Sequence, residues 1–434
     1  MAQQNINIGA APNDGTGDAL RDAFDKTNQN FTELYDFRSE NIVRVKQASD
    51  FGTVDSTKIY VIDGVVDMGS TSIEVPSGGI NMIGYTFGVS KLISSDASYT
   101  MFTSPVGGSG NVLAVDMAME VTGTGSKVFD LVSATGFDAF EFNRVNWNNC
   151  TSLGVIDNYR QGLESGTGRF GGTPELELKG TWLGGYFIDT SIVRSLTDGA
   201  YSLYKAGLAF SMSSRFRSNQ NIDLPASASF IDFAPSNFVN PSTVQLTDMI
   251  ISRNGTFYAS DSNITPNIDK SDIVCSWKNN NGLPNTFEGG SISVGTELAT
   301  TILTTGTFVT LNALTWDTLN LEHFDNPLGN QLRHLGNSPR EYKVIADLTL
   351  ESQSNNVLTV RVRKWDDSAS TFVTVLDQNR RVNSLVGGRD VAFFSINIKT
   401  ELDQNDYIEL QVANQTSTSN VTAEVDSYYM IEER

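Results

Sequence analysis

The spacing of apolar residues divides the chain into three regions with different periods. Near the N-terminus, apolar side chains recur every three to four residues, which is the period of a helix with one apolar face. In the middle, short apolar stretches alternate irregularly with Gly, Ser, Asn and Asp. Toward the C-terminus, apolar and polar residues alternate, which is typical of half-buried strands. We therefore expect a mainly β protein with domains at residues 1–40, 41–290 and 291–434.

The first region predicts a helix from about residue 18 to residue 37. The preceding residues 1–17 look extended and end in turn formers, and Asp18 is a suitable N-cap. Because the opposite helix face is polar, the helix has a single apolar stripe and is marginal in water by itself. It needs a partner, either its own domain or copies of itself. The stripe consists of Leu20, Phe24, Thr27, Phe31, Leu34 and Tyr35.

The middle region predicts a β-solenoid, in which parallel coils stack on one another. Its turns are rich in Gly and Asn, and neither a long helical stretch nor a strict repeat is visible, which suits irregular coils. A sandwich with long loops stays open as an alternative. The stretches expected to be strands are Lys58–Ile62, Ile73–Val75, Ile80–Ile83, Asn111–Met117, Lys127–Val132, Ala139–Val145, Glu175–Leu178 and Tyr186–Ile188.

The last region predicts an antiparallel sandwich of the jelly-roll type, with turns at Gly387–Gly388 and Asp403–Asp406. Each strand alternates between one apolar and one polar face, and the chain stops directly after the last one. The apolar faces are Tyr342, Val344, Ala346, Leu348 and Leu350; Leu358, Val360 and Val362; Phe394, Ile396 and Ile398; Ile408, Leu410 and Val412; and a last run of Val421, Ala423, Val425, Tyr429 and Ile431.

Composition and charge narrow the function. Lys and Arg number 30 against 50 Asp and Glu, so the net charge is -20. Phosphate contacts and anionic membrane surfaces require basic footprints, so we expect no nucleic acid as a partner and no membrane insertion. There is no apolar run long enough to span a membrane and no secretory signal. Cys150 and Cys275 are the only cysteines, which excludes a disulfide framework, and we expect both to be small buried hydrophobes.

Catalytic and metal-binding patterns are weak. The run Asp14–Asp18 is superficially like a calcium loop but lacks the remaining ligands, so we interpret it as a turn and helix cap. His323 and His334 fit no zinc pattern and are expected to be loop or packing residues. No nucleotide-binding motif is present, and we expect no cofactor, no metal and no enzymatic activity.

Paired carboxylates are the remaining route to chemistry, because glycoside hydrolysis needs only two of them. Glu175 and Glu177 point the same way if their segment is a strand. With 50 carboxylates in the chain, however, chance pairs are unavoidable. The other candidates in the middle region are Asp116, Glu120, Asp130, Asp138, Glu141, Asp157 and Asp189.

Aromatic and basic side chains are the other candidates for ligand contact. We expect the aromatic residues of the middle region to be packing residues: Trp147, Tyr159, Trp182, Tyr186 and, in a loop-like stretch, Trp277. The C-terminal region has a local excess of basic residues, interpreted first as a solvated strand face paired with Asp366, Asp367 and Asp390. These basic residues are Arg361, Arg363, Lys364, Arg380, Arg381 and Arg389.

The segment Ile6–Tyr35 closely resembles an N-terminal module of tailed-phage structural proteins, found at the start of tail fibres and tailspikes. The order NDGTGD-x-L-R-x-AF-x-K-x-N-x-NF-x-E-LY is kept nearly whole. Ala19 stands where such modules often carry Pro, and Ala is compatible with a first helical turn. The rest resembles phage fibres in architecture only, and the sandwich also looks like tumour-necrosis-factor-like and complement-globular trimer heads.

The resemblance implies a homotrimeric phage tail fibre or receptor-binding protein, synthesised in the bacterial cytoplasm and located in the virion. The helix would pack against two sister chains like a trimeric coiled coil, and the N-terminal segment would bind a phage tail, collar or baseplate protein. The residues implied for attachment and trimer formation are Leu20, Phe24, Phe31, Leu34 and Tyr35.

The same resemblance implies that the C-terminal domain adsorbs to a bacterial surface glycan or protein. Its loops Ser352–Asn356, Asp366–Ser370, Arg380–Asp390 and Gln415–Asn420 are polar. Two alternatives stay open: a tailspike depolymerase that hydrolyses surface polysaccharide with paired carboxylates, and a collar, head or baseplate fibre with a purely structural role. The residues expected to contact a receptor are Arg363, Trp365, Arg380, Arg381 and Arg389.

Overall fold

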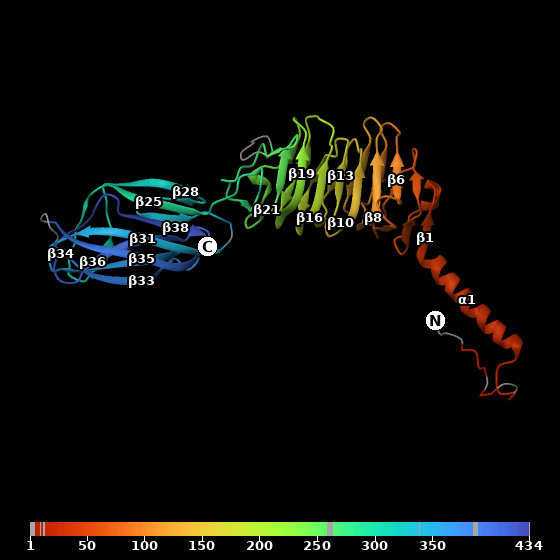
Figure 1. Cartoon of the computed structure of the whole chain (residues 1–434), viewed down its shortest axis with the longest axis horizontal. Coiled ribbons are helices and arrows are strands. Elements are labelled where there is room, and N and C mark those ends of the chain that lie inside the picture. Colours follow the sequence, from red (N-terminus) through yellow and green to blue (C-terminus); the bar gives the residue numbers. More distant parts are fainter. Residues whose placement is uncertain are drawn as a thin grey trace. The chain divides into compact units, whose positions relative to one another are not determined.

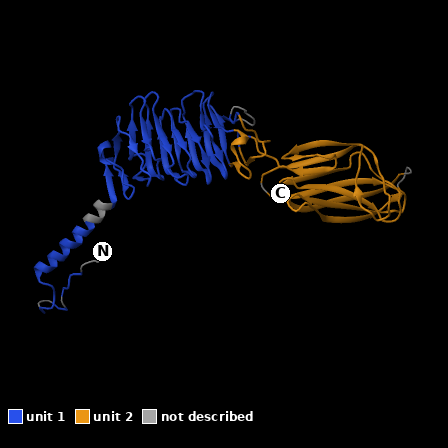
Figure 2. Cartoon of the chain, turned by 180° about the vertical axis from the view of Figure 1, so that it is seen from behind, with its two compact units in different colours: residues 1–233, 248–266, 281–283 blue, residues 234–247, 267–280, 284–434 orange. Residues whose placement is uncertain are grey.

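The computed structural model describes residues 5–8, 10–11, 14–257, 264–337, 339–384 and 389–433, without the side chains of residues 35–40. Within these residues the chain is mainly β with one α-helix, as predicted (Figure 1). It forms two compact units, made of residues 1–233, 248–266 and 281–283 and of residues 234–247, 267–280 and 284–434 (Figure 2). The predicted turn Gly387–Gly388 and the side chain of Tyr35 lie outside the described residues.

The predicted N-terminal helix is present as α1 (Leu20–Asn41). Asp18 serves a different purpose from the predicted N-cap. Its carboxylate accepts a hydrogen bond from the backbone N–H of Asn7 at 2.8 Å and pairs with Nζ of Lys26 at 2.6 Å. Lys26 also donates to the carbonyl of Asn5 at 3.1 Å. Asp18 and Lys26 therefore fasten the extended N-terminal arm to the first turns of the helix.

The turn before the helix is organised by a second carboxylate, that of Asp14. It accepts hydrogen bonds from the backbone N–H groups of Thr16 at 2.8 Å, Ala11 at 2.7 Å and Ala10 at 2.6 Å. These bonds, led by the one from Thr16, lower the pKa of Asp14 to about 2. The carboxylate of Asp14 therefore collects backbone donors and closes the turn.

The first unit contains the predicted solenoid, whose strands pair in parallel in successive coils. One sheet has the strand order β1 (Ile42–Val45), β2 (Ile59–Ile62), β5 (Ile80–Gly84), β8 (Val112–Val121), β10 (Ala139–Asn148), β12 (Gln161–Ser165), β16 (Gly185–Arg194) and β19 (Arg215–Leu224). Beside this path lie β3 (Val65–Asp67), β6 (Lys91–Ser94), β13 (Gly168–Phe170), β22 (Ile250–Arg253) and, antiparallel to β22, β23 (Thr256–Phe257).

A second parallel sheet of the solenoid has seven strands. They are β4 (Ile73–Glu74), β7 (Thr100–Thr103), β9 (Lys127–Val132), β11 (Gly154–Asp157), β14 (Leu176–Lys179), β17 (Ser202–Ala206) and β20 (Ser229–Asp232). A short parallel pair, β15 (Thr181–Trp182) and β18 (Ser211–Met212), and the 3-10 turn η1 (Ala48–Phe51) complete the coils.

Coil length varies along the solenoid, which explains why the sequence shows no strict repeat. Phe140 pairs with Val112, 28 residues before it, and with Gly162, 22 residues after it. Tyr186 pairs with Phe216, which lies 30 residues further along the chain. The pairing of β16 with β19 also shifts register once within the strands, between Asp189 and Ser191. Every stretch predicted to be a strand in this region overlaps one.

A left-handed backbone conformation recurs at one corner of neighbouring coils. Asp116, Arg144 and Thr190 have φ of 57°, 52° and 53°, and Gly166 at the equivalent position has φ of 59°. The neighbouring register pairs place these positions one above the other. Such φ values are uncommon for residues other than Gly. The guanidinium of Arg144 binds both carboxylate oxygens of Asp116, at 2.6 and 2.5 Å, and so joins two adjacent corners.

Aromatic rings from successive coils contact one another in the solenoid core. The ring centroids of Phe129 lie 5.6 Å from Phe102 and 5.1 Å from Phe140. Each such ring removes about 150–250 Å² from water, so this column is a main source of the solenoid's stability. Cys150 is buried as predicted, and burial raises its pKa to about 12. The predicted packing aromatics are buried too: Trp147, Tyr159, Trp182 and Tyr186.

The second unit contains the predicted antiparallel sandwich. One of its sheets has the order β26 (Ala299–Thr300), β37 (Val421–Ala423), β31 (Arg340–Glu351), β38 (Tyr428–Glu433), β25 (Gly289–Thr296) and β28 (Thr315–Glu322), with β35 (Asp390–Leu402) paired to β31 and to β34 (Asn383–Ser384). The other has the order β29 (Phe324–Asp325), β30 (Gln331–His334), β36 (Tyr407–Asn414), β32 (Val357–Asp366) and β33 (Thr371–Arg381), with β27 (Val309–Thr310) paired to β36.

The predicted apolar faces of β31, β32, β35 and β36 form the core between these sheets, except that Ile398 packs at its margin. The last predicted run is wrong in one respect. It is two strands, β37 and β38, because the chain turns at Asp426, whose φ is 72°, and Val425 is 47% exposed. The same unit also contains a parallel pair, β21 (Thr243–Thr247) and β24 (Cys275–Lys278), and the 3-10 turn η2 (Pro235–Asn237).

Two local predictions are corrected in this unit. The predicted loop Arg380–Asp390 contains the end of β33 and all of β34, so its first residues are strand residues. Trp277, expected in a loop-like stretch, lies on β24 and is buried, as is Cys275. The side chains of β33 are mostly exposed, so its sequence lacks the apolar alternation that identified the other strands.

Candidate functional site

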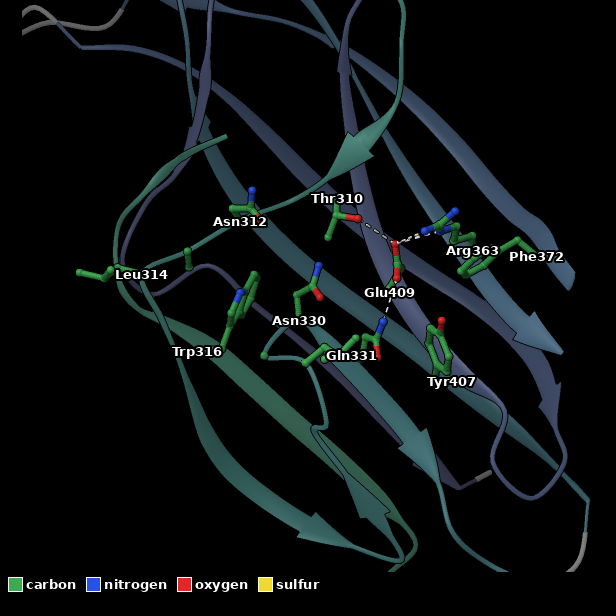
Figure 3. A pocket seen from close by; sticks show the side chains of 13 residues that line it. Thr310, Asn312, Leu314, Trp316, Asn330, Gln331, Arg363, Phe372, Tyr407 and Glu409 are labelled. Atoms are coloured by element: carbon green, nitrogen blue, oxygen red, sulfur yellow. Dashed lines mark hydrogen bonds and ion pairs between the residues drawn. The ribbon is translucent and has the colours of Figure 1, made fainter. Parts of the chain in front are cut away.

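A cavity of about 550 Å³ opens on the sandwich of the second unit (Figure 3). One side is formed by the chain from β27 to the start of β28, and another by residues 328–331, which lead into β30. The remaining wall comes from β32, β33 and β36. The lining residues are Thr310, Asn312, Ala313, Leu314, Trp316, Leu328, Gly329, Asn330, Gln331, Arg363, Phe372, Tyr407 and Glu409.

The polar centre of the cavity is the carboxylate of Glu409, which is 3% exposed. Arg363 donates to its Oε1 from Nε at 2.9 Å and from Nη2 at 2.5 Å. Thr310 Oγ1 donates to the same oxygen at 3.1 Å, and Gln331 Nε2 donates to Oε2 at 3.0 Å. The carboxylate is therefore neutralised and hydrogen-bonded, as a buried charge must be.

Aromatic rings form the other wall. Phe372 lies under the guanidinium of Arg363, with Cζ 3.4 Å from the ring centroid. Trp365 lies between Phe372 and Tyr407 in the sheet, with ring centroids 4.9 and 6.0 Å away. Trp316 of β28 faces the cavity and packs against Tyr429. Their ring centroids are 6.2 Å apart. Burial raises the pKa of the Tyr407 hydroxyl.

The structure separates the five residues that the sequence grouped as receptor contacts. Arg363 lines the cavity and Trp365 supports two of its rings. Because Trp365 pairs with Phe372 while Val357 pairs with Arg381, Arg380 and Arg381 lie at the opposite end of the β32–β33 hairpin. Arg389 pairs with Glu424 and does not line the cavity.

The basic residues of the sandwich have different acidic partners from those predicted. Arg361 binds Asp377 at 2.8 Å, Arg363 binds Glu409 and Lys364 binds Asp406 at 3.1 Å. The prediction paired them with Asp366, Asp367 and Asp390, which are close in sequence. Strand pairing places Asp377 of β33 opposite Arg361 and Glu409 of β36 opposite Arg363, and Asp406 directly precedes β36.

Sequence reasoning missed most of the cavity. Glu409 alternates with the core residues Ile408 and Leu410 on β36, and it was not among the residues predicted from the sequence. The available signal was a charged residue inside a strand that is buried on both faces, but that burial is visible only once the sheets are placed. The other residues missed are Thr310, Asn312, Trp316, Asn330, Gln331, Phe372 and Tyr407.

The carboxylates considered for hydrolysis on the solenoid largely have other partners. Glu175 and Glu177 are both half-buried, as expected for one strand face, but they pair with Lys205 at 3.8 Å and Lys179 at 3.6 Å. Burial, opposed by Lys179, raises the pKa of Asp157. The remaining contacts are Asp116 with Arg144, Asp130 with Lys127, Asp189 with Arg217, Asp138 with Ser133 and Thr135, and Glu120 with Asn149.

Both histidines are packed inside the sandwich unit, consistent with the packing role predicted. His323 Nδ1 lies 3.5 Å from Oε1 of Glu288, which also binds Arg340 Nη1 at 2.8 Å. His334 is fully buried, and its Nδ1 lies 3.0 Å from the carbonyl oxygen of Asp403. Within the described ranges, no group of three or more His, Cys, Asp or Glu residues is arranged to hold a metal ion.

His334 predicts a pH dependence of stability. Burial lowers its pKa from the usual 6.5, so the unfolded chain binds this proton more readily than the folded chain. Unfolding is therefore favoured as pH falls below about 6.5, and the contribution is fully present at higher pH. We expect the melting temperature of the wild type to fall between pH 7.5 and 5.5, whereas His334→Asn, although less stable throughout, depends less on pH in this window. Parallel melting curves for the two proteins would contradict the assignment.

The predicted apolar stripe of α1 is exposed in the single chain. Leu20, Phe24, Phe31 and Leu34 are 74%, 59%, 54% and 61% exposed. With Thr27 they are spaced alternately by four and three residues, which is a heptad pattern and keeps one seam facing a partner helix. Among the described residues of the N-terminal arm, Asn5 and Asp18 contact Lys26, which lies outside this seam.

No helix in the part of the chain that the structure describes is both long and apolar enough to cross a membrane.

The comparisons with known proteins give partial structural similarities only. No family model matches the chain, and no curated protein is similar to it. A structure of the tumour necrosis factor Eiger from S. frugiperda is 11% identical with a TM-score of 0.26, covering 34% of this chain and 92% of that one. Murine APRIL is 8% identical at pH 5.0, with a TM-score of 0.25 and coverage of 34% and 99%. At pH 8.0 it is 9% identical, with a TM-score of 0.26 and coverage of 34% and 100%.

Proposed function

We propose that this protein is a homotrimeric phage tail fibre or receptor-binding protein. It is made in the bacterial cytoplasm, becomes part of the virion through its N-terminal arm and helix, and adsorbs to the bacterial surface through its C-terminal sandwich. The observation that carries the proposal is the heptad seam of α1, in which Leu20, Phe24, Phe31 and Leu34 are exposed and Thr27 is half-buried.

An exposed apolar seam of this kind favours association with further helices. A helix of 22 residues gains its stability in proteins from packing of its apolar face. In this chain the arm occupies a neighbouring face and the seam has large rings in water. Two further copies of the same seam are the simplest partners, because a heptad seam is self-complementary. The resemblance of Ile6–Tyr35 to phage appendage modules supports a three-fold assembly anchored to a particle.

The rest of the chain fits the same role. A solenoid whose coils stack in parallel is a stiff spacer, and its length can change by adding coils. The sandwich presents a cavity with polar and aromatic walls, which is the kind of surface that recognises small ligands. The chain's net charge of -20 disfavours binding to polyanions as the basis of adsorption.

Binding to host cells tests the proposal. Fluorescently labelled full chain is incubated with the phage's host and with strains that the phage does not infect. We expect saturable binding to the host alone and slower adsorption of phage in the presence of unlabelled protein. Equal binding to all strains, or none to the host, would contradict adsorption by this chain. Release of reducing ends from host polysaccharide would favour the depolymerase alternative instead.

A further inference from the structure

We propose that the cavity around Glu409 binds an uncharged saccharide and is the receptor-contact site of the sandwich. This inference rests on the proposed function, since it names the class of receptor. It also replaces the arginines at the opposite end of the β32–β33 hairpin as the contact residues. The charge balance, the aromatic walls and the polar groups of the cavity support this assignment.

The charges of the side chains that line the cavity are balanced. Arg363 and Glu409 are the only charged residues among the thirteen side chains drawn in Figure 3, and they neutralise each other. Both Nε and Nη2 of Arg363 are already bonded to Glu409. Because Glu409 compensates the charge of Arg363, an anionic ligand would meet no net positive charge in the lining. The lining therefore favours a ligand without net charge.

The cavity lining combines aromatic rings with side-chain amides. The rings of Trp316, Phe372 and Tyr407 line the cavity, and apolar ring faces suit the C–H face of a sugar. In the part of the chain that the structure describes, the side-chain amide of Asn312 and the indole N–H of Trp316 have no hydrogen-bond partner. An amide offers two donors and an acceptor with two lone pairs, which matches neighbouring hydroxyl groups.

The size of the cavity and its accessibility from solvent also suit a saccharide. At about 550 Å³ the cavity lies within the range of about 300–1,000 Å³ typical of small-molecule sites. Leu314 and Leu328, which also line it, are 64% and 75% exposed, so the cavity is open to solvent. An open cavity of this size suits the end or a short internal segment of a glycan chain.

The test uses the full chain and a panel of disaccharides. Neutral hexose and N-acetylhexosamine disaccharides are titrated beside a sialylated and a sulfated disaccharide, with saturation-transfer NMR and calorimetry as readouts. We expect at least one neutral disaccharide to bind and the anionic ones to bind at least tenfold more weakly. Asn312→Ala, which leaves the rings in place, and Trp316→Phe should each weaken binding at least tenfold. The control is the double variant Arg380→Ala/Arg381→Ala, which should bind like the wild type.

The outcomes separate this inference from the proposed function. Preferred binding of an anionic disaccharide, unchanged binding by Asn312→Ala, or loss of binding in the arginine control would overturn the saccharide site. If the wild type binds host cells and the cavity variants bind them equally well, the site is wrong while the adsorption function stands. If the wild type binds a neutral disaccharide at the cavity but no cells, the site stands and the function fails. Self-association lost in Trp316→Phe without saccharide binding would identify a second copy as the occupant and overturn the inference.

Discussion

Replacing Phe24 and Phe31 by Asp together is expected to abolish assembly of the N-terminal helices and incorporation of the protein into particles. Both side chains lie in the exposed seam of α1. In a trimer the two substitutions place six carboxylates where only apolar side chains face one another. Burying unpaired charges costs several kcal/mol, so we expect trimer association to weaken by a factor of at least about 100.

Light scattering and particle incorporation measure the two consequences. The wild type should have about three times the chain mass of 47.3 kDa. The double variant should give a smaller species or a concentration-dependent mixture, and should be absent from purified particles. Gln29→Asp is the matched control, because it adds a charge to the polar face of the same helix and should assemble normally. A trimeric double variant that enters particles as the control does would show that the seam is not the assembly surface.

In the N-terminal region, the helix seam could be predicted from the local sequence pattern, but the roles of Asp14 and Asp18 could not. The seam from Leu20 to Leu34 was predictable because a helix places residues three and four apart on one face whatever surrounds it. The function of Asp18 was not, since its partner Lys26 is reached only when the arm folds back along the helix. Asp14 likewise has a role that depends on the turn it closes.

In the sandwich, the apolar faces of the long strands could be predicted from the sequence, but the cavity could not. The apolar faces of its long strands were predictable from alternation, and the strand β33 was missed because its side chains are mostly exposed. The cavity was beyond prediction because it depends on which strands are neighbours. Arg363 and Glu409 are 46 residues apart and meet only through the register of β32 with β36. Arg363 was identified as a candidate, but its partner and its surroundings follow from the sheet order.

The proposed saccharide site would suit adsorption through many weak contacts. A neutral saccharide held by rings and amides, without charge pairing, would bind with modest affinity. Three sandwiches in a trimer and several trimers on a particle would make later contacts intramolecular, so avidity can exceed single-site affinity by a factor of about 10² to 10⁴. Loss of the seam on α1 would then reduce adsorption even with the cavity intact.

The other large effect is expected inside the solenoid, at a buried ion pair. Glu164 and Arg169 are 1% and 2% exposed, with Oε1 and Nη2 3.2 Å apart. Tyr186 donates to the same Oε1 at 2.5 Å, and burial together with the charge of Glu164 raises the pKa of Tyr186 well above its ordinary value. Nη1 of Arg169 donates to two backbone carbonyls, those of Pro174 and Leu203, both at 2.8 Å.

Arg169→Met should therefore destabilise the solenoid by about 3–5 kcal/mol, because it leaves a carboxylate buried without its counter-charge. Hydrogen exchange of peptides from β12 and β14 measures the local stability of these coils. The expected loss of stability corresponds to a decrease in amide protection of at least about 100-fold. The matched control is Arg144→Met, which removes a pair whose arginine is 54% exposed and should cost less than about 1 kcal/mol. The double variant Glu164→Gln/Arg169→Met should recover part of the loss, since no unpaired charge remains. If Arg169→Met and Arg144→Met lower protection equally, burial of the Glu164–Arg169 pair does not determine its contribution to the stability of the coils.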